Sequence, residues 1–164
     1  MPEKLRMVCA MAVPGIIPIA YEPHGRTEAI GLYADGQFLG SVSYAFPKGF
    51  RLDSGWEQHK RLYAVLHTFD AEGHYRDSQI WCAGTWAEQQ RDGSVLARAR
   101  AHLATLLRSL PRRTYTDIAV RPFQLVVDGV LFGLVTGEDE EELWAELYPD
   151  NLGFGPPWDG SYDT

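Results

Sequence analysis

The chain has 164 residues, of which 45% are hydrophobic and 23% charged, and this balance predicts one soluble globular domain over residues 1–164. The same proportions exclude a disordered chain, a collagen and a coiled coil, and the lack of an apolar run of about 18 residues excludes a transmembrane helix. The formal net charge is −7, and nine acidic residues without any Lys or Arg lie between residues 138 and 164.

The N-terminal segment has an apolar stretch after two basic residues, as a signal peptide would. Pro14 and Pro18 interrupt that stretch, so we expect mature protein. Alternative start positions downstream of the first methionine predict poor order over residues 1–12. The two cysteines, Cys9 and Cys82, are too few for a disulfide framework and lack the spacing of a zinc site, which favours a cytoplasmic protein with reduced thiols.

Three segments share one pattern, in which a turn containing an acidic residue and glycine separates two runs of β-forming residues. Such a turn between apolar runs indicates a β-hairpin, because glycine adopts a positive φ without a Cβ clash. The pattern predicts strand pairs over 29–44, 62–82 and 118–136, with turns at 34–36, 70–73 and 128–129. Pro122 lies inside the third segment and lacks a backbone donor, so we expect it at an edge, a bulge or a strand start.

Apolar residues recur at three- and four-residue spacing between residues 94 and 110, which predicts an amphipathic helix that ends before Pro111. A second, shorter helix is predicted over 139–147, because its acidic residues would lie in the first turn, where the helix dipole favours them. Residues 85–90 are predicted to form a further helical turn. The last segment, 148–164, contains several prolines and glycines and is predicted to be an extended tail.

These elements predict an α+β fold. We expect an antiparallel meander sheet of about six strands, formed by the three hairpins. The long helix would pack on one face of that sheet, and the short acidic helix would lie near the C-terminus. The aromatic residues of the tail favour its docking on the domain.

No pattern typical of a nucleophile, a phosphate-binding loop or a dinucleotide site is present in the sequence. We therefore favour a protein without catalytic activity and expect no cofactor. Four residues around one predicted turn are weak candidates for a metal or acid–base site: His67, Asp70, His74 and Asp77. The alternative, which we prefer, is an exposed hairpin turn, where acidic residues and glycine are favoured for conformational reasons.

Six arginines lie in and around the predicted long helix, between residues 91 and 113, and a basic helix face can neutralise phosphates. The net charge of −7 and the lack of a helix-turn-helix pattern argue against nucleic-acid binding. These arginines would instead pair with acidic residues of the same chain or stay solvated.

The acidic C-terminal part is the predicted partner-binding region, because carboxylates interleaved with aromatic side chains favour a protein with a basic surface. The candidate residues are Glu140, Glu141, Trp144, Trp158, Asp159, Tyr162 and Asp163. Two alternatives stay open: the acidic residues form only a solvated face, and the aromatic residues lock the tail onto the body of the domain.

Three stretches of the chain carry a family resemblance, namely 17–23 together with 33–38, then 63–70, and the ending at 154–164. They resemble a group of actinobacterial proteins labelled formate hydrogenlyase regulatory protein, and the resemblance spans the chain from about Met11. It implies a transcriptional regulator of a hydrogenase pathway. It implies no catalytic or ligand residue at any position here, and a regulator that binds another protein fits the sequence better than one that binds DNA directly.

The sequence thus predicts a non-enzymatic protein-interaction or regulatory module that makes no membrane contact. One alternative is an immunity-type inhibitor of a basic toxin, since a small acidic domain suits such a target electrostatically. A second alternative is a small-ligand or metal-binding enzyme of unknown reaction.

Overall fold

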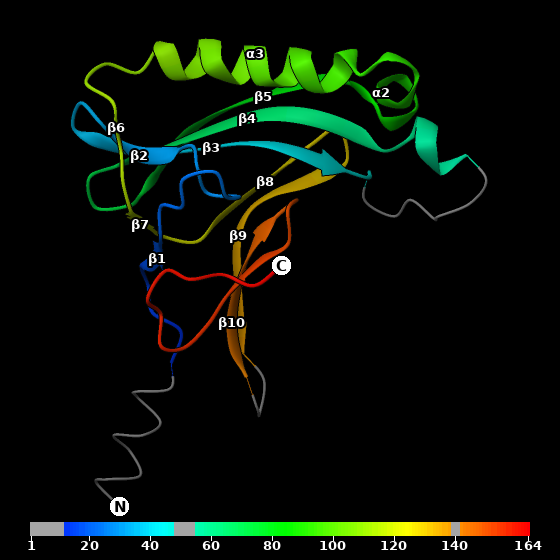
Figure 1. Cartoon of the computed structure of the whole chain (residues 1–164). Coiled ribbons are helices and arrows are strands. Elements are labelled where there is room, and N and C mark those ends of the chain that lie inside the picture. The colour runs from blue at the N-terminus through cyan, green and yellow to red at the C-terminus, as the bar shows by residue number, and fades with distance from the viewer. Residues whose placement is uncertain (1–11, 48–54, 139–141) are drawn as a thin grey trace, which may run out of the picture.

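The structure is a computed structural model that describes residues 12–47, 55–138 and 142–164. It is a mixed α+β fold, in which a long helix lies across one sheet and a second sheet lies on the opposite side (Figure 1). The strands are β1 (Ile17–Ile19), β2 (Ile30–Tyr33), β3 (Gly36–Ala45), β4 (Arg61–Asp70), β5 (Tyr75–Thr85), β6 (Thr114–Tyr115), β7 (Ile118–Val120), β8 (Phe123–Val127), β9 (Val130–Glu138), β10 (Leu143–Tyr148) and β11 (Leu152–Phe154). The helices are the 3-10 turn η1 (Trp56–Gln58), α2 (Trp86–Asp92) and α3 (Ser94–Arg108).

The strands form three antiparallel sheets. The largest has the order β5-β4-β3-β2-β6, the second has the order β11-β10-β9-β8, and β1 pairs with β7 in the third. The predicted α+β class is confirmed. The three predicted hairpins are confirmed too, and they correspond to the pairs β2–β3, β4–β5 and β8–β9. The prediction of one six-stranded sheet is wrong, because the third hairpin extends the second sheet and five further short strands complete the pairing.

Turn chemistry explains why the hairpins were predictable. Asp128 and Gly129 have φ values of 54° and 76° between the paired residues Val127 and Val130, as a tight two-residue turn requires. Pro122 lies between β7 and β8, where the predicted strand is interrupted and no ladder hydrogen bond is lost.

Strand β4 is the centre of the core and is buried on both faces from Leu62 to His67. Its side chains alternate: Leu66 packs with residues of α3, whereas Val65 packs with Phe132 of β9. A strand covered on both sides needs apolar residues in a continuous run. This alternation places α3 and the second sheet on opposite faces of the five-stranded sheet.

The predicted long helix is confirmed as α3, which ends at Arg108 and buries Val95, Ala99 and Leu103 toward the sheet. The predicted helical turn after β5 is α2. Thr85 caps it through a capping box with Glu88, in which each residue accepts a hydrogen bond from the backbone N–H of the other.

The predicted acidic helix over 139–147 is wrong. Residues 139–141 lie outside the described residues, and Leu143–Tyr148 form strand β10 between β9 and β11. Ala145 and Leu147 point into the core with the two-residue period of a strand. Pairing on both sides outweighs the helix preference of the glutamates.

The last segment passes alongside β1 (Figure 1). The backbone N–H of Ala20 donates to the carbonyl of Gly160 at 2.9 Å, and Gly153 and Asp163 form a reciprocal pair of backbone hydrogen bonds. The predicted tail therefore includes β11 and lies against the domain. Of the predicted poorly ordered residues 1–12, all but Ala12 lie outside the described residues.

Candidate binding cleft

A cleft with a volume of about 970 Å³ lies between α3, β3 and the loop formed by residues 22–29. It is open to solvent rather than enclosed, and the turn after β10 and the C-terminal segment complete its lining. Its size falls in the range of about 300–1,000 Å³ that is typical of ligand sites.

The floor of the cleft is apolar. On α3, Leu96, Leu103 and Leu107 lie on one helical stripe, because they are separated by seven and four residues. On the facing strand, Gly40 lets the helix approach: a Cβ there would lie 3.2 Å from Cδ1 of Leu103 and 3.1 Å from the carbonyl oxygen of Ala29. A side chain at this position would therefore require a small shift of Leu103 or of the Ala29 backbone.

The walls of the cleft carry positively and negatively charged side chains. Glu22, Arg26 and Glu28 come from the loop, Arg100 comes from α3, and Asp150 comes from the turn after β10. The loop is held by backbone bonds from Gly25 to the Glu22 carbonyl and from Glu22 to the Thr27 carbonyl. The described lining thus presents three carboxylates and two guanidinium groups.

Asp150 is the most buried charge of the cleft, with a side chain that is 8% exposed. Its carboxylate lies 3.6 Å from Nη2 of Arg26, and it also hydrogen-bonds Ser43. Burial raises the pKa of the Asp150 carboxyl, and Ser43 and Arg26 only partly oppose this rise. An additional positive charge nearby would therefore stabilise the ionised form of Asp150.

Two hydroxyl groups lie side by side at the cleft. Oγ of Ser41 lies 2.9 Å from Oγ of Ser43, and Ser43 in turn hydrogen-bonds the carboxylate of Asp150. Burial raises the pKa of the Tyr44 hydroxyl, which also lines the cleft.

Tyr162 is the predicted partner-binding residue that the structure brings to the cleft. Its hydroxyl accepts a hydrogen bond from the backbone N–H of Arg26 at 3.0 Å, and its ring lies 6.4 Å from that of Phe154. Tyr162 therefore anchors the C-terminal segment and lines the cleft at the same time.

The other predicted partner-binding residues do not gather at one place. Trp158 is half-buried against the core of the second sheet, and Trp144 covers Gly137 on β9, where a Cβ would lie 2.1 Å from the indole. Asp159 is exposed and accepts hydrogen bonds from Ser161. Asp163 is exposed at its backbone pairing with Gly153. Glu140 and Glu141 lie outside the described residues.

Of the four predicted metal candidates, Asp70 and His74 lie together, whereas Asp77 and His67 lie apart from them. Asp70 and His74 lie in the β4–β5 turn with Glu72, and one ligand atom of each lies within 4.8 Å of the others. Oδ1 of Asp70 accepts hydrogen bonds from the backbone N–H groups of Glu72 and His74, at 2.9 and 2.8 Å. These bonds lower the pKa of Asp70, and they tie its side chain to the backbone of the turn. Asp77 is exposed on β5.

His67 lies away from that turn cluster, buried on β4 at 3% exposure. Its Nδ1 lies 2.6 Å from Oγ of Ser78, and its ring packs on Phe123 at 4.8 Å. Burial lowers its pKa to about 3, so the imidazole is neutral at physiological pH. His67 therefore packs in the core as a neutral ring.

Arg98, Arg108 and Arg113, in and just after the long helix, bond to other groups of the chain. Arg98 donates to the carbonyl of Ala83 at 2.9 Å and lies 3.7 Å from the carboxylate of Glu88, and Arg113 donates to the carbonyl of Leu107. Arg100 instead lines the cleft. The sequence suggested that these arginines form one basic face, whereas in the structure they have different contacts.

Comparison with family models, with curated proteins and with solved structures found no match to this chain. Within the described residues, no helix combines the length and the apolar character that a membrane crossing demands.

Proposed function

We propose that the protein is a non-enzymatic interaction module whose cleft between α3 and residues 22–29 receives a segment of a partner protein. One observation carries the proposal: a cleft of about 970 Å³ that combines an apolar floor with walls of both charges. An apolar floor supplies affinity, and a few charged groups fix orientation and specificity.

The open shape favours a segment of a larger partner over a small molecule. A small-molecule site encloses most of its ligand, whereas this cleft stays open to solvent. The helix stripe of Leu96, Leu103 and Leu107 offers a surface for apolar side chains of an incoming segment.

The partner's segment would combine an apolar side chain with a basic one. Glu22, Glu28 and Asp150 outnumber the two arginines of the lining, and Asp150 gains from a second cation because burial raises its pKa. This agrees with the expectation of a basic partner. We propose that the contact lies in the cleft, to which the acidic C-terminal part contributes Asp150 and Tyr162.

A regulatory role by protein contact follows as part of the same proposal, and it is compatible with the resemblance to formate hydrogenlyase regulatory proteins. A cytoplasmic location belongs to the proposal as well.

A bulky residue in the cleft tests the proposal. Ala104 lines the cleft, whereas Ala101 lies exposed on the same helix, so Ala104→Trp blocks the cleft and Ala101→Trp is the matched control. Each variant and the wild-type protein are expressed in the native host and purified from it at physiological salt, and the bound proteins are quantified by mass spectrometry.

We expect a stoichiometric partner with the wild-type protein and with Ala101→Trp, and its loss with Ala104→Trp at an unchanged melting temperature. A partner that is retained by Ala104→Trp would place the contact elsewhere. The absence of any partner with all three proteins would refute the interaction function itself.

A further inference from the structure

Four aromatic rings surround the side-chain ammonium of Lys60. The ring centroids lie 4.9 Å from Nζ for Trp86, 5.2 Å for Tyr44, 5.8 Å for Phe46 and 6.0 Å for Trp56. All four rings are half-buried. We call this arrangement the aromatic cage. The negative faces of aromatic rings attract a cation at these distances.

The cage is held together by contacts that do not involve the Lys60 side chain. The ring of Trp86 packs on Tyr44 at 5.2 Å and on Trp56 at 6.4 Å. The backbone of Lys60 accepts from the N–H of Trp86 at 2.8 Å and donates to the carbonyl of Trp56 at 3.0 Å. Removing the lysine side chain would therefore leave the rings in position.

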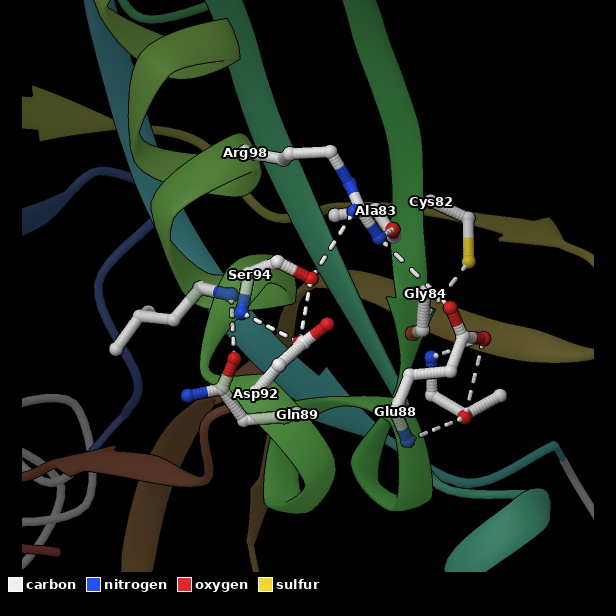
Figure 2. Close-up of polar contacts among 10 residues, drawn as sticks. Cys82, Ala83, Gly84, Glu88, Gln89, Asp92, Ser94 and Arg98 are labelled. Atoms are coloured by element: carbon white, nitrogen blue, oxygen red, sulfur yellow. Dashed lines mark hydrogen bonds and ion pairs between the residues drawn. The ribbon is translucent and has the colours of Figure 1, made fainter.

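The helix that carries Trp86 is also fixed at both ends. Figure 2 shows Glu88 bonded at the start of α2, and Gln89 and Asp92 bonded to the first turn of α3. Arg98 of α3 reaches back to the carbonyl of Ala83, just before α2. These bonds orient Trp86 before any ligand arrives.

Lys60 suits the cage less well than a quaternary ammonium group would. Within residues 12–47, 55–138 and 142–164, no carboxylate lies within 4.0 Å of its ammonium, so aromatic rings are its main neighbours. A primary ammonium has three N–H donors and is strongly hydrated, and rings satisfy those donors poorly. A quaternary ammonium has no donor and prefers an aromatic cage. The flexible lysine stem can swing out into water.

We propose that the aromatic cage is a binding site for a quaternary ammonium group, and that Lys60 is an internal occupant that the ligand displaces. A shallow hollow of about 660 Å³ is lined by residues close in sequence to Trp56 and Trp86, with Glu57 and Glu88 as its carboxylates and Arg91 as its guanidinium. Glu57 is exposed, whereas Glu88 already contacts Thr85 and Arg98. The two carboxylates outnumber the one guanidinium of this lining, which favours a cationic ligand over an anionic one. Tyr44 belongs to the cage and to the cleft lining, but the proposal does not depend on a partner segment in the cleft.

The test removes the internal occupant and offers a probe cation. Lys60→Ala and Lys60→Gln are titrated with choline chloride while tryptophan fluorescence is recorded, at an ionic strength held constant with sodium chloride. The neutral isostere 3,3-dimethylbutan-1-ol is titrated in parallel. We expect saturable binding of choline to both variants in the millimolar range, binding to the wild-type protein about tenfold weaker, and no saturable response to the alcohol.

Two further variants locate the site. Trp86→Leu in the Lys60→Ala protein abolishes choline binding, whereas Trp81→Leu, which changes an exposed tryptophan on β5 outside the cage, leaves it intact. Circular dichroism confirms the fold of each variant. Equal responses to choline and to the alcohol, or no saturable response by either folded Lys60 variant, would overturn the proposal.

Discussion

The guanidinium of Arg26 lies 3.6 Å from the carboxylate of Asp150, and this contact joins the loop before β2 to the turn after β10. The two residues therefore connect segments that lead into different sheets, and both line the cleft. A partner segment that binds Asp150 would therefore also affect the Arg26–Asp150 contact, which links the two sheets.

The burial of Asp150 predicts a pH dependence of stability. Because burial raises its pKa in the folded protein, the folded state binds this proton more tightly than the unfolded state. The free energy of unfolding should then fall as the pH rises from the ordinary carboxyl pKa through the raised value. Asp150→Asn removes this contribution, and urea unfolding of both proteins between acidic and neutral pH measures the difference.

Asp159 provides the control for that experiment. Ser161 lowers the pKa of this exposed carboxyl, so its contribution is present above the ordinary carboxyl pKa and is lost as the pH falls. Asp159→Asn should therefore change the pH dependence in the opposite direction. Equal effects of the two substitutions would contradict the role assigned to the burial of Asp150.

His67 predicts sensitivity to acid. Its pKa is lowered to about 3 by burial, so the unfolded chain takes up a proton below about pH 6.5 while the folded protein does not. Stability should fall with decreasing pH over that range, by up to about 1.4 kcal/mol per pH unit from this group. His67→Gln should reduce that slope in urea unfolding. Ser78→Ala, which keeps the titrating ring, should retain it.

The capping box at α2 predicts a measurable loss on truncation. Thr85→Ala removes the hydroxyl that accepts from the backbone N–H of Glu88 at 3.2 Å, which should cost about 1 kcal/mol of stability. Thr85→Ser keeps the hydroxyl and should behave as the wild-type protein in thermal unfolding. Since Trp86 is the first residue of α2, Thr85→Ala in the Lys60→Ala protein should also weaken choline binding.

The aromatic residues of the C-terminal segment predict two different effects. Trp158 packs against the core of the second sheet, so Trp158→Ala should destabilise the protein by about 2 kcal/mol. Tyr162→Phe loses only the hydrogen bond from Arg26 and should cost about 1 kcal/mol. Chemical denaturation measures both. A stability unchanged by Trp158→Ala would show that this side chain is free for a partner instead.

Most of the elements that could be predicted were indicated by local features of the sequence. The acidic-glycine turns and the helical spacing of residues 94–110 are properties of short segments, and each corresponds to an observed element. The β10 segment lacks such a unique signal, because Leu143 and Leu147 share one face in a strand and in a helix alike. Its pairing with β9 and β11 decided between the two, and a single sequence does not display that pairing.

The candidate cleft was beyond sequence reasoning for a related reason. Its charges come from the loop at residues 22–29, from α3 and from Asp150, and no spacing rule links such distant segments. Tyr162 was among the predicted partner-binding residues, whereas Asp150 was only one of the nine acidic residues of the C-terminal part. The aromatic cage could not be predicted from the sequence either, because Tyr44 and Trp86 become neighbours only when β3 and α2 are in place.

The pairing of β1 with β7 has a consequence for synthesis on the ribosome. Ile17–Ile19 pair with Ile118–Val120, and Ala20 bonds to Gly160. At about 5–20 residues per second, translation needs several seconds after β1 has been made before β7 exists. Strand β1 therefore waits longer for its partner than the hairpin strands do, because each hairpin joins neighbouring segments of the chain. A nascent chain in that interval would carry Ile17 and Ile19 without their pairing strand.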